Sequence, residues 1–273
     1  MIRKAIYIFQ ARGISGLLRA TYSRTLGLFT KCARSFCTYQ NLFIGKSGIE
    51  IGGPSQAFSR RGIFPVYPIV ENLDNCNFFS TTVWEGAINK GKTYWFDPKK
   101  PAGQQHIVEA SAMEGLTSNA YDFVLSSHML EHTANPILAL SEWKRLLTVD
   151  GTLVLLLPDK NHTFDHRRPV TMMEHLIADF DAGMTEDDLT HLPEILAQHD
   201  LERDPEAGNM DAFKSRSMRN FENRCLHHHV FDRQLAINLV EYIGFRVFSV
   251  EEIYPHHILL LAQKTAAIPQ PDN

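Results

Sequence analysis

Short apolar runs alternate with helical repeats in the centre of the chain. Residues 123–125 (Phe-Val-Leu) and 152–158 are apolar runs of the kind that form strands buried on both faces of a parallel sheet. Between them, Pro136 begins a segment whose apolar residues recur at helical spacing as far as Leu147, and Asp150-Gly151 ends it. Strand, crossover helix and strand predict a doubly wound α/β fold, which binds ligands at the carboxyl ends of its strands.

A second strand signal lies nearer the N-terminus. Residues 47–55 read Ser-Gly-Ile-Glu-Ile-Gly-Gly-Pro-Ser, a short apolar strand that ends in two glycines. Glycine accepts positive φ without steric cost, so the chain can turn tightly here and a ligand can approach the bare backbone. Glu50, just before the turn, can accept hydrogen bonds from an amine or a hydroxyl of that ligand. A turn with two glycines is by itself a weak signal, because many such turns bind nothing.

Together these segments resemble the class I S-adenosylmethionine-dependent methyltransferases, most closely the small-molecule branch called type 11. The resemblance rests on the acidic-glycine turn, on Tyr-Asp-Phe-Val at 121–124 with Leu-Glu-His at 130–132, and on Trp-Lys-Arg-Leu-Leu at 143–147 followed by Asp-Gly. It covers residues 45–158 and 230–264. It implies a Rossmann-like, mostly parallel sheet with an antiparallel C-terminal strand. A helix at 231–244 and a strand pair at 245–254 and 258–263 would complete this core.

The resemblance also implies that S-adenosylmethionine binds along the strand ends. In this fold the second strand usually ends in an acidic residue that holds the ribose hydroxyls. With a strand over residues 66–73, Asp74 is the first candidate and Glu71 the second, while a solvated loop carboxylate is the alternative for either. Ser111 stands where an Asp is common, and Pro54 stands where a third small residue is common. The expected cofactor-binding residues are Glu50, Gly52, Gly53, Asp74, Ser111, Ala112, Met113, Ser126 and Ser127.

His128 is the residue we expect to act in catalysis. It follows Ser126-Ser127 at the carboxyl end of a strand, beside the expected position of the methyl group. A hydroxyl nucleophile must lose its proton, and a histidine with a pKa near neutrality suits that task. Capping of the following helix is the alternative role for His128. Asp165 and His166 are the other candidate bases.

The segment between the last parallel strand and the final helix is too long for a plain loop. Its helical spacing at 172–180 and 189–199 predicts a helical lid over the site. We expect its residues Arg167, Arg168, His175 and His228 to bind the substrate. For the two arginines, pairing with the acidic run at 181–188 is the alternative.

The many histidines of this half do not form a recognised metal-binding pattern. No His-x-x-x-His pair stands with a third ligand at a known spacing. His227, His228 and His229 cannot all face one ion on an extended chain, because side chains alternate. The sequence therefore assigns no metal site and leaves open whether this His- and Asp-rich segment binds an ion.

Composition and charge set the remaining expectations. Eight of the 27 Lys and Arg residues lie in residues 1–49, which contain no Asp or Glu, so the rest of the chain has a net charge of −12. Residues 1–36 could contact an anionic membrane surface or pack as a helix on the core. The net charge of −4 gives no reason to expect a nucleic-acid partner. The four cysteines lack paired spacing and indicate reduced thiols in a cytoplasmic protein.

These expectations divide the chain into five parts: a basic helical extension (1–40), a Rossmann-like core (41–160), a helical lid (161–229), a helix and strand pair that complete the core (230–265), and a tail (266–273). The predicted function is methyl transfer to a hydroxyl or amine of a small molecule, with sugars and glycoconjugates as one acceptor class. The alternative is a non-catalytic nucleotide-binding protein or an NAD-dependent enzyme on the same fold.

Overall fold

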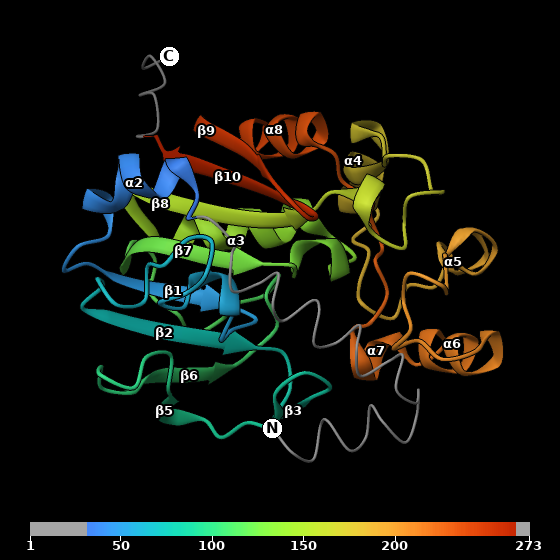
Figure 1. Cartoon of the computed structure of the whole chain (residues 1–273), viewed down its shortest axis with the longest axis horizontal. Helices are drawn as coiled ribbons and strands as arrows, with labels where there is room; N and C mark the ends of the chain where they lie inside the picture. The colour runs from blue at the N-terminus through green and yellow to red at the C-terminus, as the bar shows by residue number, and fades with distance from the viewer. Residues whose placement is uncertain (1–31, 266–273) are drawn as a thin grey trace, which may run out of the picture.

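The structure, a computed structural model, describes residues 32–265 and is built around one eight-stranded sheet (Figure 1). In spatial order the strands are β5 (Gly91–Tyr94), β6 (Gly103–Ile107), β2 (Asn72–Asn77), β1 (Ser47–Ile51), β7 (Tyr121–Ser127), β8 (Leu147–Pro158), β10 (His257–Lys264) and β9 (Phe245–Ile253). The five strands from β6 to β8 are parallel, and β10 is antiparallel to both β8 and β9. The predicted α/β fold, mostly parallel with an antiparallel C-terminal strand, is confirmed.

Three helices cover one face of the sheet: α3 (Pro136–Leu146), α4 (Met173–Asp181) and α8 (Arg233–Tyr242). The side chain of Asn135 caps α3 by accepting from Leu138 N at 3.0 Å, and Asp232 caps α8 by accepting from Leu235 N at 2.7 Å. The apolar stripe of α3, centred on the fully buried Trp143, packs on the strands. The apolar pattern and the capping residues therefore place α3 and α8 where the sequence predicts them.

The opposite face is covered without a long helix. The crossover from β1 to β2, residues 52–71, contains only the short 3-10 helix η2 (Gln56–Phe58), although such crossovers usually contain an α-helix. Its buried aromatic residues Phe58, Phe64 and Tyr67 pack on the sheet with the helix α2 (Arg34–Tyr39). Phe64 makes edge contacts with Phe36 and Phe43, at 5.1 and 5.5 Å between ring centroids.

This crossover corrects one predicted strand. The apolar residues Val66 and Val70 suggested a strand over residues 66–73, but they pack on the sheet face as irregular chain. The strand itself is β2, whose sequence Asn-Leu-Asp-Asn-Cys-Asn has little apolar pattern. Its buried amides pair instead with neighbouring segments: Asn75 Nδ2 donates to Gly53 O in the glycine turn at 3.0 Å and to Gln105 Oε1 on β6 at 3.0 Å.

The segment between β8 and α8 lies beyond the carboxyl ends of the parallel strands (Figure 1). Besides α4 it holds η4 (Lys160–His162), α5 (Leu192–Gln198), α6 (Met210–Ser217) and α7 (Asn220–Asn223). Helix α4 joins the main core through Leu176, whereas α5 and α6 share a small separate cluster that includes Ile195 and Phe213. The shorter elements elsewhere are η1 (Gln40–Leu42), η3 (Leu130–His132) and the hairpin β3 (Thr81–Thr82) with β4 (Gly86–Ala87).

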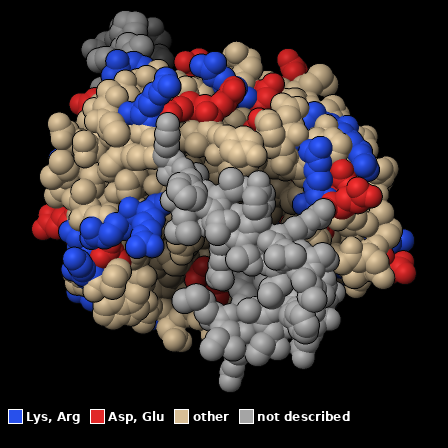
Figure 2. All heavy atoms as spheres, viewed as in Figure 1, with Lys and Arg blue, Asp and Glu red and all other residues tan. Residues whose placement is uncertain are grey.

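On the face shown in Figure 2, visible basic and acidic side chains are interspersed rather than gathered into one field. None of the helices within residues 32–265 has the length and hydropathy needed to span a bilayer. The predicted membrane contact of residues 1–36 falls almost entirely on residues 1–31, which lie outside the described residues. The described end of that segment, α2, packs on the core, and Glu251 accepts from the backbone N–H groups of Arg34 and Ser35 at 3.1 Å.

Close packing of β1 on β7 gives a first prediction. A Cβ atom on Gly48 would lie 2.2 Å from Cε2 of the buried Phe123. We expect Gly48→Ala to lower the free energy of unfolding by about 1–3 kcal/mol, the usual cost of overpacking a core. Urea unfolding measures this, with Ser47→Ala on the same strand as the control. Equal stability of the Gly48→Ala variant and the wild type would contradict the packing argument.

Candidate functional site

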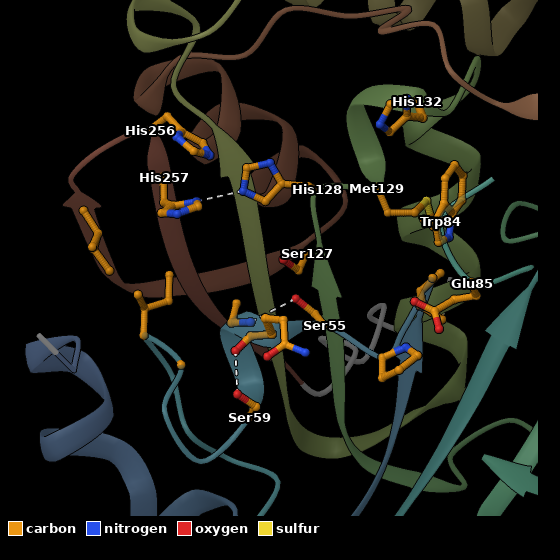
Figure 3. Close-up of a pocket in the computed structure, with 18 of the residues that line it drawn as sticks. Ser55, Ser59, Trp84, Glu85, Ser127, His128, Met129, His132, His256 and His257 are labelled. Carbon is orange, nitrogen blue, oxygen red and sulfur yellow. Dashed lines mark hydrogen bonds between the residues drawn. The ribbon is translucent and has the colours of Figure 1, made fainter. Parts of the chain in front are cut away.

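One large cavity, of about 1530 Å³, lies at the carboxyl ends of the parallel strands (Figure 3). Four adjacent strand ends contribute to its wall: Gly52 after β1, Asn77 at the end of β2, Ala110 after β6, and Ser127 at the end of β7. The turn between β9 and β10 contributes His256, and the first residue of β10 contributes His257. The wall is therefore drawn from segments far apart in the sequence that the sheet brings to one edge.

The glycine turn after β1 forms the floor of this cavity. Gly52 has φ +80°, and its N–H donates to Cys76 O at 2.8 Å. A Cβ atom on Gly52 would stand 3.1 Å from Met129 Cγ, so a side chain here would crowd the cavity. Gly53 lies behind the wall, where its N–H donates to Asn75 Oδ1 at 3.0 Å and where a Cβ would meet Glu50 Cδ at 2.3 Å. Both positions thus require glycine, but only Gly52 lines the cavity.

Glu50 does not face the cavity, in contrast to its predicted contact with a ligand. Its fully buried carboxylate accepts from Tyr67 OH at 2.5 Å, from Tyr94 OH, and from Ser55 N at 3.0 Å. Burial raises the pKa of Glu50 to about 7, against the opposing effect of these donors. Glu50 therefore holds the glycine turn after β1 from the side that faces away from the cavity.

The predicted position of Asp74 after the second strand is wrong, because Asp74 lies inside β2. Its carboxylate accepts from Gln104 N at 2.8 Å and from Tyr121 OH at 3.0 Å, away from the cavity. The residue at the strand end is Asn77, which lines the cavity and donates from Nδ2 to Gly53 O at 3.3 Å. Asn77 Oδ1 is buried and has no hydrogen-bond partner among the described residues. An acceptor in this setting suits a ligand hydroxyl.

The cavity wall beyond β6 comes from Glu109 and Ala110 rather than from residues 111–113. Met113 is fully buried in the main core, and its N–H donates to Glu142 Oε2 at 3.1 Å. Ser111 and Ala112 are not among the residues that line the cavity. The cavity thus reaches the end of the third parallel strand, where its lining residues Glu109 and Ala110 precede the predicted residues 111–113 in the chain.

At the end of β7, Ser127 and His128 line the cavity, whereas Ser126 is buried inside the strand. His128 has φ +50°, a conformation that is uncommon for a residue with a side chain, and its N–H donates to Leu156 O at 2.8 Å. The strand ladder thus continues through the backbone of His128 while its side chain turns into the cavity (Figure 3). The first residue of η3 is Leu130 and its N-cap is Met129, so His128 does not cap a helix.

His128 forms a hydrogen-bonded pair with His257. Its Nε2 lies 2.8 Å from His257 Nδ1 (Figure 3). Its Nδ1 lies 3.6 Å from Glu131 Oε1. Burial lowers the pKa of His128 well below 6.5 and that of His257 to about 4, so both rings are neutral near pH 7. The buried Glu131 carboxylate has no hydrogen-bond partner among the described residues, and burial raises its pKa to about 7. Neutral imidazoles beside an unpaired carboxylate can accept a proton.

The other two predicted bases lie outside the cavity. Asp165 contacts Arg168 Nη1 at 3.0 Å and His227 Nδ1 at 2.5 Å; burial opposes its ionisation, but His227 and Arg168 hold its pKa at about 2. His166 pairs through Nε2 with Asp200 at 2.8 Å.

The predicted substrate-binding residues make structural contacts instead of lining the cavity. Arg168 is buried and donates to Glu194, to Asp165 and to the backbone carbonyls of His227 and His228. Arg167 contacts Asp200 at 3.3 Å. His228 Nε2 lies 2.9 Å from Asn220 Nδ2, and His175 Nε2 lies 2.7 Å from His191 Nε2. The structure therefore brings together Gly52, Ser127 and His128 of the predicted site residues, and leaves the others outside the cavity wall.

Several lining residues were not predicted from the sequence, with His257 the foremost. The available signal was a His-His pair at 256–257 directly before an apolar strand that pairs with β8, which places it beside the end of β7. Trp84 and Arg224 also line the cavity. Arg224 Nη2 contacts Glu109 Oε2 at 2.7 Å, a contact across 115 positions that no local pattern reveals.

Comparison with known proteins connects this cavity to a family. Residues 71–155 match the family model described as a methyltransferase domain. A solved putative S-adenosylmethionine-dependent methyltransferase from Listeria monocytogenes is 15% identical, covers 89% of this chain and 99% of its own, and has a TM-score of 0.49. A putative methyltransferase from Bacillus halodurans is 10% identical over 85% of this chain and 98% of its own, with a TM-score of 0.47. No curated protein matches the chain.

The buried Glu50 carboxylate gives a pH-dependent prediction. The folded pKa of about 7 exceeds the unfolded value of 4.5, so the stability from this group is complete below pH 4.5 and is lost as the pH rises through about 7. We expect the free energy of unfolding of the wild type, relative to Glu50→Gln, to fall by about 3 kcal/mol across this range. Urea unfolding of both proteins at pH 5 and pH 8 measures the difference. Parallel pH profiles would contradict it.

Proposed function

Because this chain contains a class I S-adenosylmethionine-dependent methyltransferase domain, with S-adenosylmethionine as its cofactor, we propose that it methylates a hydroxyl or amine of a small molecule. The observation that carries the proposal is the single cavity shared by the ends of β6, β2, β1 and β7. Its volume of about 1530 Å³ leaves room for an acceptor beside a nucleoside cofactor.

The residues at the strand ends fit S-adenosylmethionine. The turn at Gly52 presents bare backbone to the amino-acid part of the cofactor. Asn77 Oδ1, a buried acceptor without a partner among the described residues, suits a ribose hydroxyl. Ala110 and Glu109 stand at the next strand end, where the adenine would lie. With the cofactor bound in this order, we expect its methyl group near Ser127 and His128.

Bound S-adenosylmethionine supplies an electrophilic methyl group on a sulfonium centre. The protein's own contribution is alignment of the two reactants and removal of the acceptor's proton. His257 Nε2 makes no hydrogen bond among the described residues, while His257 Nδ1 faces His128 and His128 in turn faces Glu131. A proton accepted by this pair creates a positive charge that the Glu131 carboxylate stabilises. The pair, rather than His128 alone, is the base in our proposal.

A polyhydroxylated acceptor, such as a sugar or glycoconjugate, suits the side of the cavity beside this pair. That wall carries Glu251, Glu252 and His256 from β9 and the following turn, together with Ser59 and Gln56 from the crossover. Carboxylates, an imidazole, a hydroxyl and an amide offer several acceptors and donors for hydroxyl groups. Because this wall carries the carboxylates of Glu251 and Glu252, it gives less support to a strongly anionic acceptor.

Binding of the cofactor at the Gly52 turn is directly testable. We expect Gly52→Leu to weaken S-adenosylmethionine binding at least about tenfold, or 1.4 kcal/mol, because the side chain would enter the cavity beside Met129. Isothermal titration calorimetry with S-adenosylmethionine, S-adenosylhomocysteine and NAD makes the measurement. Gly115→Leu is the matched control, since Gly115 also has positive φ, at +83°, but lies outside the cavity. Equal affinity of the Gly52→Leu variant and the wild type, or preferential binding of NAD, would overturn the assignment.

The proposed base predicts a selective loss of turnover. We expect His128→Ala and His257→Ala each to lower kcat by roughly a hundred- to ten-thousandfold while leaving S-adenosylmethionine affinity nearly unchanged. Since the pKa of the stabilising Glu131 carboxylate is about 7 and that of His257 is about 4, kcat/KM of the wild type should decline as the pH falls through about 7 and fall further toward pH 4.

Transfer of radiolabelled methyl groups to a panel of glycosides, phenols and amines measures these rates. His162→Ala, an exposed histidine outside the cavity, is the control. Turnover near the wild-type level in both cavity variants would exclude the pair as the base.

A further inference from the structure

Four potential metal ligands meet outside the cavity wall, at the junction of the lid and the core. They are His175 and Asp179, one turn apart on α4, His191 just before α5, and His229 before α8. One ligand atom from each lies within 4.8 Å of all the others. The closest pairs are His175 Nε2 with His191 Nε2 at 2.7 Å and His229 Nε2 with Asp179 Oδ2 at 2.9 Å.

Hydrogen bonding within the protein does not satisfy His229. Its Nδ1 lies 3.3 Å from the carbonyl oxygen of Thr133, and its Nε2 lies 2.9 Å from the Asp179 carboxylate. Both neighbours accept hydrogen bonds, yet a neutral imidazole has only one N–H. The His229 side chain is fully buried, and a metal ion between its Nε2 and the Asp179 carboxylate would satisfy the second contact.

The outer contacts of the cluster also match those of a metal site. Histidine ligands usually donate their second ring N–H to a carboxylate or a backbone carbonyl, which leaves the other nitrogen free for the ion. His229 Nδ1 faces the Thr133 carbonyl, and His191 Nδ1 lies 3.3 Å from Asp188 Oδ2. In both rings this leaves Nε2, the atom that faces the cluster, as the unprotonated ligand.

We propose that His175, Asp179, His191 and His229 bind one zinc ion in a closed, structural site. Three imidazole nitrogens and one carboxylate oxygen form a set that zinc accepts, and four protein ligands leave no open position for catalysis. Bonds of about 2.0–2.1 Å in a tetrahedron place the ligand atoms about 3.3 Å apart, within the spread of 2.7 to 4.8 Å seen here.

The site would join the lid to the wall of the cavity. Its ligands come from α4, from the start of α5 and from the chain before α8. Thr133, whose carbonyl contacts His229, lines the cavity, as does Glu186, which accepts from Ala134 N at 3.0 Å. An ion here would fix the wall on the side of Thr133 without contacting a ligand in the cavity.

Three other groups of potential ligands are less suitable. His128 with His256 and His257, and Glu131 with His132 and His227, contain residues of the cavity wall and of the proposed base. The third group, Asp188 with His191 and His228, has only three members and shares His191 with the proposed site. The three consecutive histidines have different partners: His229 faces the cluster, while His228 contacts Asn220 and His227 contacts Asp165.

Metal content provides the test. Tag-free protein is stripped with a chelator, incubated with Zn²⁺, desalted and analysed by plasma mass spectrometry. We expect one zinc ion per chain in the wild type and less than about a tenth of an ion in His175→Ala. His175 is half exposed on α4, so its loss should not prevent folding. Glu174→Ala, at the neighbouring exposed position, is the control and should retain one ion.

A second measurement distinguishes this site from the cavity clusters. Cobalt bound to the wild type should give the intense visible bands of a tetrahedral centre, and these should disappear in His175→Ala and remain in His257→Ala. The chelator should lower the thermal midpoint of the wild type and of Glu174→Ala but leave that of His175→Ala unchanged. A wild type that binds no zinc, or a His175→Ala variant that still binds one ion, would overturn the proposal.

Discussion

The buried carboxylate of Glu50 holds together the part of the fold on which the cavity depends. It lies in the central strand β1 and accepts hydrogen bonds from Tyr67 in the crossover, from Tyr94 on the edge strand β5, and from Ser55 in the turn. A buried carboxylate left without such donors would be costly, so the three segments are fixed relative to one another. An irregular segment rich in aromatic residues replaces the usual crossover helix after β1. The hydrogen bonds to Glu50 fix this segment in place, as a helix would otherwise do.

The asparagines of β2 add to the same constraint. Asn75 and Asn77 both donate to Gly53 O, and Asn75 Oδ1 accepts from Gly53 N. The glycine turn is thus held from the strand beside it and from Glu50 beneath it. Of these two side chains, only Asn77 has an acceptor without a partner among the described residues, and Asn77 lines the cavity. Structural and binding roles are in this way divided among neighbouring polar residues of one strand.

Charged and histidine side chains, rather than a large apolar core, organise the segment between β8 and α8. Its small cluster around Ile195 and Phe213 is accompanied by pairs such as His166 with Asp200 and His199 with Asp204. Arg168 donates both to the backbone before α8 and to acidic residues of this segment. Buried charges of this kind are tolerated only when they are paired, which explains why Arg168 is a structural residue and not a ligand for substrate.

The sequence by itself determined the parallel core, the helices α3 and α8, the antiparallel end and the positions of Gly52, Ser127 and His128. These follow from local periodicity, from glycine conformation and from the rule that parallel strands end at one edge. The strand order and the place of β2 did not follow, because β2 has a polar pattern that only its partners in the turn explain.

The inward or outward direction of each polar side chain was likewise decided by tertiary structure. Glu50 accepts hydrogen bonds from two tyrosines of other segments. Arg168 donates hydrogen bonds to the backbone carbonyls of residues 227 and 228. His257 reached His128 across 129 positions of the chain. Such contacts depend on which segments the sheet brings together, and a sequence pattern contains spacing along the chain but not proximity in space.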